Sequence, residues 1–243
     1  MTDTLQRPLS IWTTGEPVPQ AARRAGSFAR MIRAKTGAAW PGEWSNIDVT
    51  DPEARLPEPD EIAGVIVTGS PARVADQRPW MRRVQRGLSE LVAMNVPVLG
   101  ICFGHQLLGM ALGGWSGPNR RGREIGTVDL RVRASDPILG PPGRIAVSMT
   151  HLDVVLEVPR NANVLAATEL DPHAAIRFGE QAWGVQFHPE MDGAILRDYI
   201  ETLHDALVSE GIDPAARLES CAETPESENM LREFARRAAA VRL

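Results

Sequence analysis

The chain has 243 residues, of which 43% are hydrophobic and 23% charged, and its formal net charge of −5 gives no overall bias toward nucleic acid. No apolar run approaches the roughly 18 residues of a membrane span, and the N-terminal residues lack the pattern of a secretory leader. We therefore expect a cytoplasmic protein. Two cysteines, Cys102 and Cys221, cannot form a disulfide framework.

The first half of the chain predicts alternating strands and helices. The run at 62–71 is apolar almost throughout, as in a parallel strand that is covered on both faces. Residues 20–37 have helical spacing and end at a glycine, and Pro79 begins a second helix. Residues 96–114 then indicate a strand, a turn and a helix. The other expected strands are 9–15 and 44–51.

In the second half, short β-like runs separated by turns replace this alternation, and we expect some of them to add antiparallel strands. A helix is expected at 193–211, then a polar tail with a loop at 223–229 and an amphipathic helix at 230–243. The order predicts an α/β fold: an open, mostly parallel sheet flanked by helices in three layers, flavodoxin-like, with a C-terminal helical appendage. The β-like runs are 123–134, 143–150, 163–170, 174–179 and 182–190.

The turn Gly100-Ile101-Cys102-Phe103-Gly104 places a thiol between a strand and a helix, which is the G-x-nucleophile-x-G elbow pattern. The glycines allow backbone segments to approach closely, and the N-terminus of the following helix favours a thiolate. The N–H of Phe103 would face an oxyanion that forms beside Cys102. A free cysteine is more often a small buried hydrophobe, so the elbow by itself leaves both interpretations open.

A thiolate nucleophile needs a base, and the base needs a group that orients it. Of the five histidines, His188 ends an apolar strand before Pro189, with Glu190 two residues on. Extended residues i and i+2 point to the same side, so Glu190 could hold one ring nitrogen while the other faces Cys102. The segment by itself also fits a strand-ending turn, but its pairing with an elbow favours a triad. His105 is expected to point away along the helix.

The second oxyanion donor is expected at Gly69-Ser70, where the run 62–71 ends before Pro71. Active sites of parallel sheets gather at the carboxyl ends of strands, and Gly69 has no side chain to prevent a close approach. A simple turn before Pro71 is the alternative. No cluster of cysteine and histidine has the spacing of metal ligands, and no cofactor is expected.

Together these motifs resemble the class I, triad-type glutamine amidotransferases, in which a G-x-C-x-G-x-Q elbow is paired with a late H-x-E. Domains of the GMP synthetase type look closest. Their Gly-Gly-Pro loop corresponds to 69–71, their R-E-x-G segment to 123–126 and their M-S-H-x-D segment to 149–153. The resemblance implies a catalytic domain at 1–211, with 212–243 as a helical extension of the same domain.

The resemblance implies hydrolysis of glutamine to glutamate and ammonia through a γ-glutamyl thioester on Cys102. It also implies that Gln106 and the backbone around Thr150 and His151 hold the amino-acid end of the substrate. A hydrogen-bonded loop histidine is an equally good interpretation of His151. For Asp153 we favour a role in orienting that loop over a contact with the substrate ammonium.

Ser70 departs from the family's glycine, and its Cβ is tolerable only at negative φ. No P-loop for ATP occurs in the sequence, so the ammonia would pass to a separate synthase partner. The alternative is a free-standing γ-glutamyl peptidase or hydrolase. A non-catalytic binding or regulatory module is a third reading, which the intact triad disfavours. We expect no nucleic-acid or membrane partner, and the oligomeric state stays open.

Overall fold

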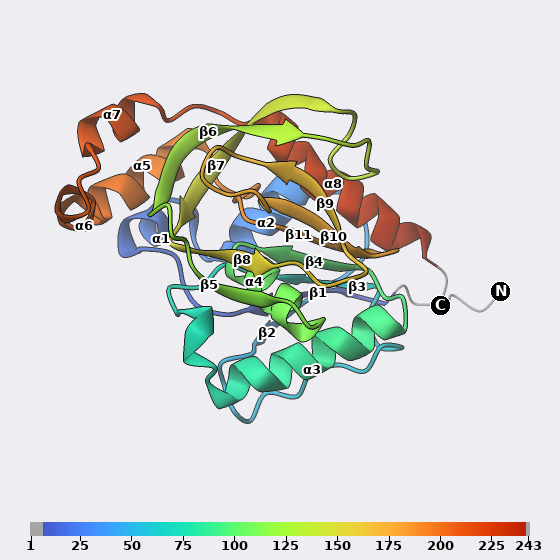
Figure 1. Ribbon diagram of the computed structural model, residues 1–243. Helices are drawn as coiled ribbons and strands as arrows, with labels where there is room; N and C mark the ends of the chain where they lie inside the picture. Colours follow the sequence, from blue (N-terminus) through green and yellow to red (C-terminus); the bar gives the residue numbers. More distant parts are fainter. Residues whose placement is uncertain (1–6, 242–243) are drawn as a thin grey trace.

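In the computed structural model, which describes residues 7–241, a nine-stranded sheet forms the centre of the molecule (Figure 1). Five neighbouring strands run parallel, and four more continue the sheet in antiparallel pairs. Across the sheet the strands are β2 (Trp44–Asp48), β1 (Leu9–Thr13), β3 (Gly64–Val67), β4 (Val98–Ile101), β11 (Ala182–Val185), β10 (Ala175–Gly179), β9 (Asn163–Ala167), β6 (Glu124–Val132) and β7 (Gly143–His151).

The strand that comes last in the chain lies in the middle of this sheet. β11 pairs in parallel with β4, with Val185 opposite Ile101, and antiparallel with β10 on its other side. β4 ends immediately before Cys102, and the chain after β11 leads directly to His188. Parallel pairing therefore brings the predicted nucleophile and base to the same edge of the sheet.

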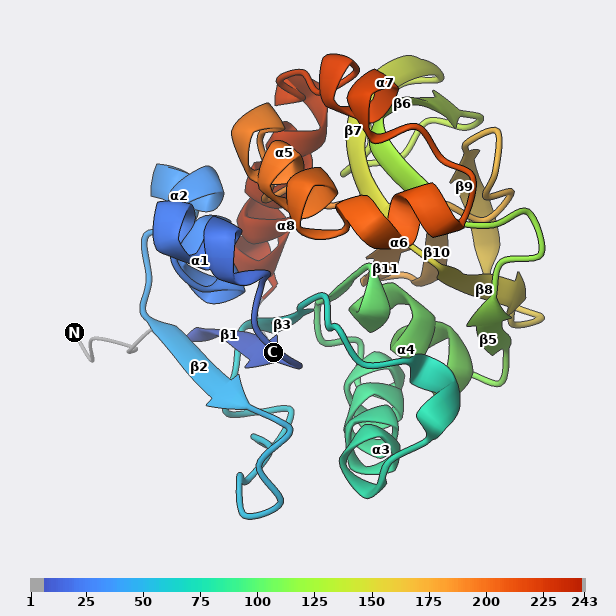
Figure 2. The same ribbon diagram turned by 90° about the vertical axis from the view of Figure 1, so that its left-hand side faces the viewer.

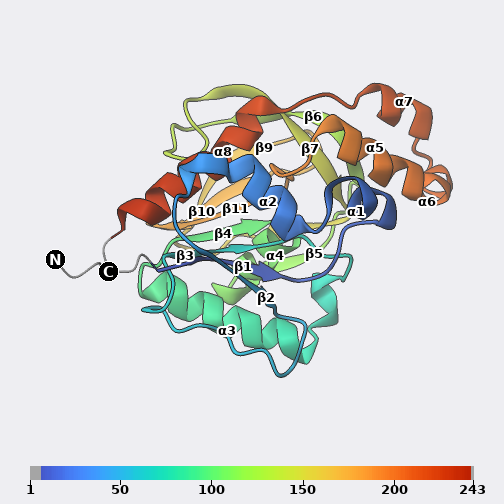
Figure 3. The ribbon, with the colours of Figure 1, turned by 180° about the vertical axis from the view of Figure 1, so that it is seen from behind.

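Neighbouring residues of the parallel strands face opposite cores, because side chains alternate along a strand. Ile66 and Leu99 belong to one core, and Val65 and Val98 belong to the other. Helices cover both faces, which makes three layers (Figure 3). The covering helices are α2 (Phe28–Thr36) and α8 (Pro225–Ala240) on one face, and α3 (Pro79–Ala93) and α4 (Phe103–Ala111) on the other.

The single helix expected over 20–37 is wrong, because α1 (Pro19–Ala25) and α2 are separate helices. Gly26 between them has a φ of 86°, which an α-helix does not allow. Ser27 then caps α2 by accepting a hydrogen bond from the N–H of Arg30 at 3.3 Å. The break lets α1 turn away from α2 and pack on α5 (Gly193–Thr202).

The C-terminal part is helical, with more helix than the sequence patterns predict. The helix expected at 193–211 divides at Leu203 into α5 and α6 (His204–Ser209), and α7 (Pro214–Glu219) follows. The loop expected at 223–229 is wrong after its first residues, because α8 already begins at Pro225. Of the helix predicted at 230–243, residues 242–243 lie outside the described part of the chain.

Sequence patterns also did not predict β5 (Trp115–Pro118) and β8 (Asp153–Glu157), which form a separate antiparallel ribbon. The expected fold class is confirmed: the mostly parallel sheet is flanked by helices, carries antiparallel additions and is followed by a helical part. Between residues 7 and 241, none of the helices has the length and apolar character needed to cross a bilayer.

Candidate active site

Cys102 lies at the turn between β4 and α4, with a φ of 51° and a ψ of −102° that side-chain-bearing residues rarely adopt. Both neighbouring glycines are required. A Cβ on Gly100 would lie 2.5 Å from the carbonyl of Gly104, and a Cβ on Gly104 would lie 2.4 Å from the carbonyl oxygen of Val67. Phe103 begins α4, so its N–H has no acceptor within the helix. The turn therefore holds the thiol at the positive end of a helix.

His188 and Glu190 form a buried pair, with 2.7 Å between Nδ1 of the histidine and Oε1 of the glutamate. Burial acts to lower the pKa of His188, but the Glu190 carboxylate and the Cys102 sulfur outweigh it and raise that pKa to about 10. The protonated imidazole is thus favoured at neutral pH. Because Glu190 holds Nδ1, Nε2 is the ring nitrogen that can exchange a proton with the sulfur.

Gly69, just after β3, lies close to both His188 and Cys102. A Cβ on Gly69 would lie 2.8 Å from Cε1 of His188 and 3.8 Å from Cβ of Cys102. The structure therefore brings together the three strand ends on which the sequence analysis placed the nucleophile, the base and an oxyanion donor.

Ser70 satisfies the condition that its Cβ imposes, because it is not among the described non-glycine residues with positive φ. Its hydroxyl donates to the carbonyl of Thr14 at 2.6 Å and accepts from the N–H of Ala72 at 3.1 Å. The side chain that replaces the family's glycine thus anchors the loop to the end of β1.

Gln106, expected to contact substrate, turns its amide nitrogen into the protein. Nε2 donates to the carbonyl of Asp153 at 2.7 Å and to Oε1 of Gln186 at 3.1 Å. Gln186 in turn donates from Nε2 to Sγ of Cys102 at 3.4 Å. Sequence reasoning missed Gln186, whose only signal is a polar residue in an apolar run, two positions before His188.

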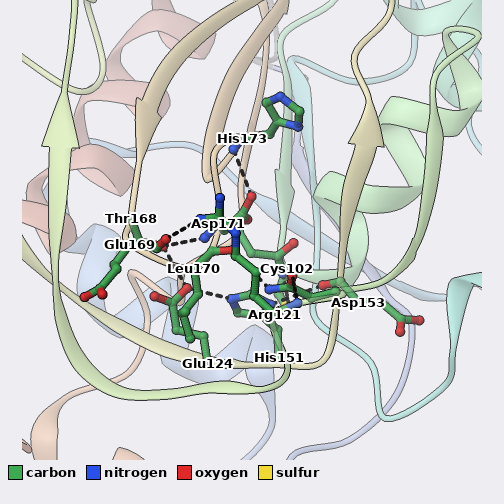
Figure 4. Close-up of polar contacts among 12 residues, drawn as sticks. Cys102, Arg121, Glu124, His151, Asp153, Thr168, Glu169, Leu170, Asp171 and His173 are labelled. Carbon is green, nitrogen blue, oxygen red and sulfur yellow. Dashed lines mark hydrogen bonds and ion pairs between the residues drawn. The ribbon is translucent and has the colours of Figure 1, made fainter.

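His151 uses both ring nitrogens within the protein, 3.1 Å from Oε2 of Glu124 and 3.2 Å from the carbonyl oxygen of Asp153 (Figure 4). This arrangement fits the hydrogen-bonded loop histidine considered above. The Asp153 carboxylate pairs with Arg73 at 2.6 Å, which joins the loop after β3 to the start of β8. Thr150 lies at the cavity beside them.

These side chains line a cavity of about 370 Å³ at the carboxyl ends of the parallel strands. In Figure 2, α1 and α5 lie on one side of these strand ends and α4 on the other. The polar lining, which we call the polar wall, consists of Arg73, Gln106, Arg123, Thr150, His151 and Asp153. The mainly apolar lining, which we call the apolar wall, consists of Val18, Phe28, Tyr199 and Leu203.

Within residues 7–241, no three His, Cys, Asp or Glu side chains are grouped so that they could hold a metal ion. On the polar wall, Arg123 pairs with Glu210 at 2.8 Å, and this hydrogen-bonded cation lowers the pKa of Glu210. On the apolar wall, the ring of His188 stacks on Phe28 with 6.2 Å between centroids. His188 therefore contacts the apolar wall through Phe28.

Known proteins similar to this chain include GMP synthases and a γ-glutamyl peptidase. GMP synthase [glutamine-hydrolyzing] from Aeropyrum pernix is 39% identical over 130 residues, which are 53% of this chain and 24% of that protein. The enzyme of the same name from Porphyromonas gingivalis is 40% identical over 144 residues, 58% of this chain and 27% of that protein. The chain therefore spans about a quarter of the length of these relatives.

The peptidase is matched along most of its length. Gamma-glutamyl peptidase 3 from Arabidopsis thaliana is 27% identical over 179 residues, which cover 71% of this chain and 72% of the peptidase. Among solved structures, a glutamine amidotransferase from Thermotoga maritima superimposes with a TM-score of 0.71 at 22% identity, covering 97% of this chain and 100% of that one. At this identity the likeness shows the fold alone.

The family model "Glutamine amidotransferase class-I" matches residues 42–200, well over half of the chain. This span includes the elbow, the loop after β3, the polar wall and the His188–Glu190 pair. The chain belongs to the class-I glutamine amidotransferase family.

Proposed function

We propose that the protein hydrolyses the γ-glutamyl amide of glutamine through a thioester on Cys102, with His188 and Glu190 completing the triad. The observation that carries the proposal is the position of His188, hydrogen-bonded to Glu190 at 2.7 Å and next to Cys102 across Gly69. In the first half-reaction the sulfur attacks the carbonyl carbon, and His188 gives its proton to the departing ammonia. In the second, His188 takes a proton from water, which attacks the thioester and releases glutamate.

The oxyanion of each tetrahedral intermediate would be bound by backbone donors at two strand ends. Phe103 at the start of α4 offers one N–H, and Gly69 or Ser70 offers the other. The Ser70 hydroxyl, bonded to Thr14 at 2.6 Å, supports this role because it fixes the loop that carries the second donor.

The polar wall suits the amino-acid end of the substrate, because that end carries both charges. Arg73 would attract the α-carboxylate, while Oε1 of Gln106 and the backbone at Thr150 would accept hydrogen bonds from the α-ammonium. His151 and Asp153 would act by holding this wall in place, since their polar atoms already bond to neighbouring protein groups.

The test is turnover of glutamine by the wild type and by Cys102→Ala, measured as ammonia and glutamate released in equal amounts. Cys221→Ala is the matched control, because Cys221 is the other thiol in the chain and lies in the tail. We expect activity in the control and none above background in Cys102→Ala. Equal turnover by both variants would remove the nucleophile assignment, and a folded wild type inactive on every γ-glutamyl amide would favour a non-catalytic module.

A γ-glutamyl peptidase activity is the second candidate function, and the apolar wall favours it. The leaving nitrogen must reach His188, whose ring stacks on Phe28, and Phe28 packs in an apolar cluster with Tyr199 and Val18. An apolar substituent on that nitrogen would be buried there, whereas ammonia gains nothing from such a wall. The peptidase from Arabidopsis thaliana, matched over 72% of its length, supports the same candidate.

Comparing kcat/KM for glutamine with that for γ-glutamyl dipeptides of apolar residues separates the two functions. The peptidase function predicts a higher value for the dipeptides and a loss of that preference in Phe28→Ala. The glutaminase function predicts the reverse order, together with a glutamine turnover that rises when a synthase partner binds. The apolar packing of α8 against α2 supports treating 1–211 and 212–243 as one domain in either case.

A further inference from the structure

Gln186 is a fully buried amide that contacts the sulfur of the elbow. It lies one residue after β11, and its backbone N–H donates to the carbonyl of Ala174 at 2.8 Å. Its side chain has two polar neighbours: Nε2 is 3.4 Å from Sγ of Cys102, and Oε1 is 3.1 Å from Nε2 of Gln106. A buried amide costs free energy unless it is hydrogen-bonded, so these two contacts explain how a glutamine can occupy this position.

The direction of this hydrogen-bond chain follows from its far end. The carbonyl oxygen of Asp153 can only accept, so the group of Gln106 that lies 2.7 Å from it must be the amide N–H₂. The second hydrogen of that group then faces Gln186, whose side-chain carbonyl oxygen must accept it. The N–H₂ of Gln186 is therefore the end that points at Cys102. A main-chain carbonyl thus fixes a donor on the sulfur, whatever the state of the thiol.

We propose that Gln186 is a positioning residue that stabilises the thiolate of Cys102, and that Gln106 keeps it in the donating orientation. A hydrogen bond to an ionised group is about twice as strong as one between neutral groups, so the contact favours the thiolate over the thiol. The proposal deepens the proposed function, because the thiolate is its nucleophile. It adds a second donor to a sulfur that otherwise depends on His188 and the N-terminus of α4.

The contact would matter at two points of the reaction. Before attack it holds the negative charge on sulfur, and when water breaks the thioester it receives the charge that returns to sulfur. The thioester carries no charge on sulfur, so Gln186 would stabilise the free thiolate, before attack and after hydrolysis, more than it stabilises the thioester. Its loss should therefore make the thiolate less favourable at a given pH, while the thiolate that does form should be intrinsically more nucleophilic.

The rate of alkylation of Cys102 by iodoacetamide, followed by mass spectrometry between pH 4 and pH 10, tests this inference. All proteins would carry Cys221→Ser, so that one thiol is observed. Gln186→Met keeps the length of the side chain without a donor, and Gln186→Glu keeps the acceptor for Gln106 while facing the sulfur with a carboxylate. Ser148→Ala is the control, because Ser148 is equally buried and near His188 but bonds to Met191.

We expect the midpoint of the alkylation profile to move up by about one pH unit in Gln186→Met, and at least as far in Gln186→Glu. At the wild-type midpoint this is a fall in rate of about fivefold, approaching tenfold at lower pH, whereas the rate at high pH should be unchanged or higher. Ser148→Ala should follow the wild-type profile. A profile of Gln186→Met that coincides with the wild type, in a protein of unchanged Tm, would overturn the inference.

A second variant and the choice of alkylation as the measurement cover the cases in which Gln186→Met does not fold or the protein has no γ-glutamyl activity. Should Gln186→Met fail to fold, Gln106→Leu removes the orienting bond instead and should shift the midpoint in the same direction; an unshifted midpoint there counts against the proposal. Alkylation needs no γ-glutamyl substrate, so it is independent of the proposed function. A shifted profile in a protein that hydrolyses no γ-glutamyl amide would retain the role of Gln186 and remove the function.

Discussion

The backbone of Gly69 and the imidazole of His188 lie so close that a Cβ at Gly69 would come within 2.8 Å of Cε1 of the ring. The contact is with a side chain held by Glu190 on one side and stacked on Phe28 on the other, so the ring has little freedom to yield. The position of the His188 ring therefore requires a glycine in the loop after β3.

Gly69→Ala should lower kcat/KM for glutamine by about 100-fold, because a small displacement of a catalytic group has an effect of this size. The fold should persist, since the clash is confined to the site. Gly143→Ala is the matched control: no atom lies within 4 Å of its added Cβ, and its φ is not in the positive range. Wild-type turnover by Gly69→Ala would mean that His188 is free to move.

Replacing Cys102 should separate stability from activity. Cys102→Ala and Cys102→Gly should both be inactive. In urea unfolding, the free energy of unfolding of Cys102→Gly should be higher than that of Cys102→Ala by about 1 kcal/mol, because glycine adopts a φ of 51° without strain. The comparison is between two inactive proteins, so it isolates the backbone. The opposite order of stability would mean that the turn imposes no strain on a residue with a side chain.

Ser70→Ala should weaken both the fold and the reaction. The two hydrogen bonds of the hydroxyl, at 2.6 Å and 3.1 Å, would be lost, which lowers the free energy of unfolding by about 1–2 kcal/mol. The loop would also hold its oxyanion donor less firmly, which lowers kcat. Ser89→Ala is the control, because its hydroxyl bonds to a carbonyl of α4 at 2.7 Å, away from the cavity. It should lose stability but keep activity.

His105 should make the protein sensitive to acid. It is fully buried against Phe178, and burial lowers its pKa to about 3. Between pH 6.5 and that value the unfolded chain binds a proton that the folded chain does not, so stability falls as the pH falls. From pH 6.5 to pH 4.5 the wild type should lose about 2 kcal/mol more than His105→Leu.

Urea unfolding at the two pH values measures this difference. The exposed His204 provides the control, and His204→Asn should show the acid sensitivity of the wild type. Parallel behaviour of the wild type and His105→Leu would contradict a neutral, buried His105.

Local sequence patterns predicted the parallel strands, the elbow and the spacing of His188 and Glu190, because each depends on residues that are close in the chain. Gly26 and Pro225 mark two helix boundaries that the sequence patterns did not predict. Apolar spacing continued the first helix through Gly26, where a positive φ ends it. Polar composition indicated a loop at Pro225, where a helix begins. Both signals were present in the sequence but were outweighed by periodicity.

Gln186 could not have been predicted in this way. Its contact with Cys102 depends on the parallel pairing of β11 with β4, two strands that are separated by more than 70 residues of other elements. Its partner Gln106 was expected to face substrate, and only the position of the Asp153 carbonyl reverses that expectation for the amide nitrogen. The contacts of Gln186 and of Gln106 therefore both depend on strands and loops that are far apart in the sequence.

The central position of β11 also has a consequence for synthesis on the ribosome. β4 and its cysteine are made early, but the edge of β4 that receives β11 stays unpaired until residues 182–185 have emerged. Throughout that interval the thiol has neither His188 nor Gln186 beside it. The nascent chain therefore carries an open strand edge for much of its translation, and Cys102 gains His188 and Gln186 as neighbours only after β11 has paired with β4.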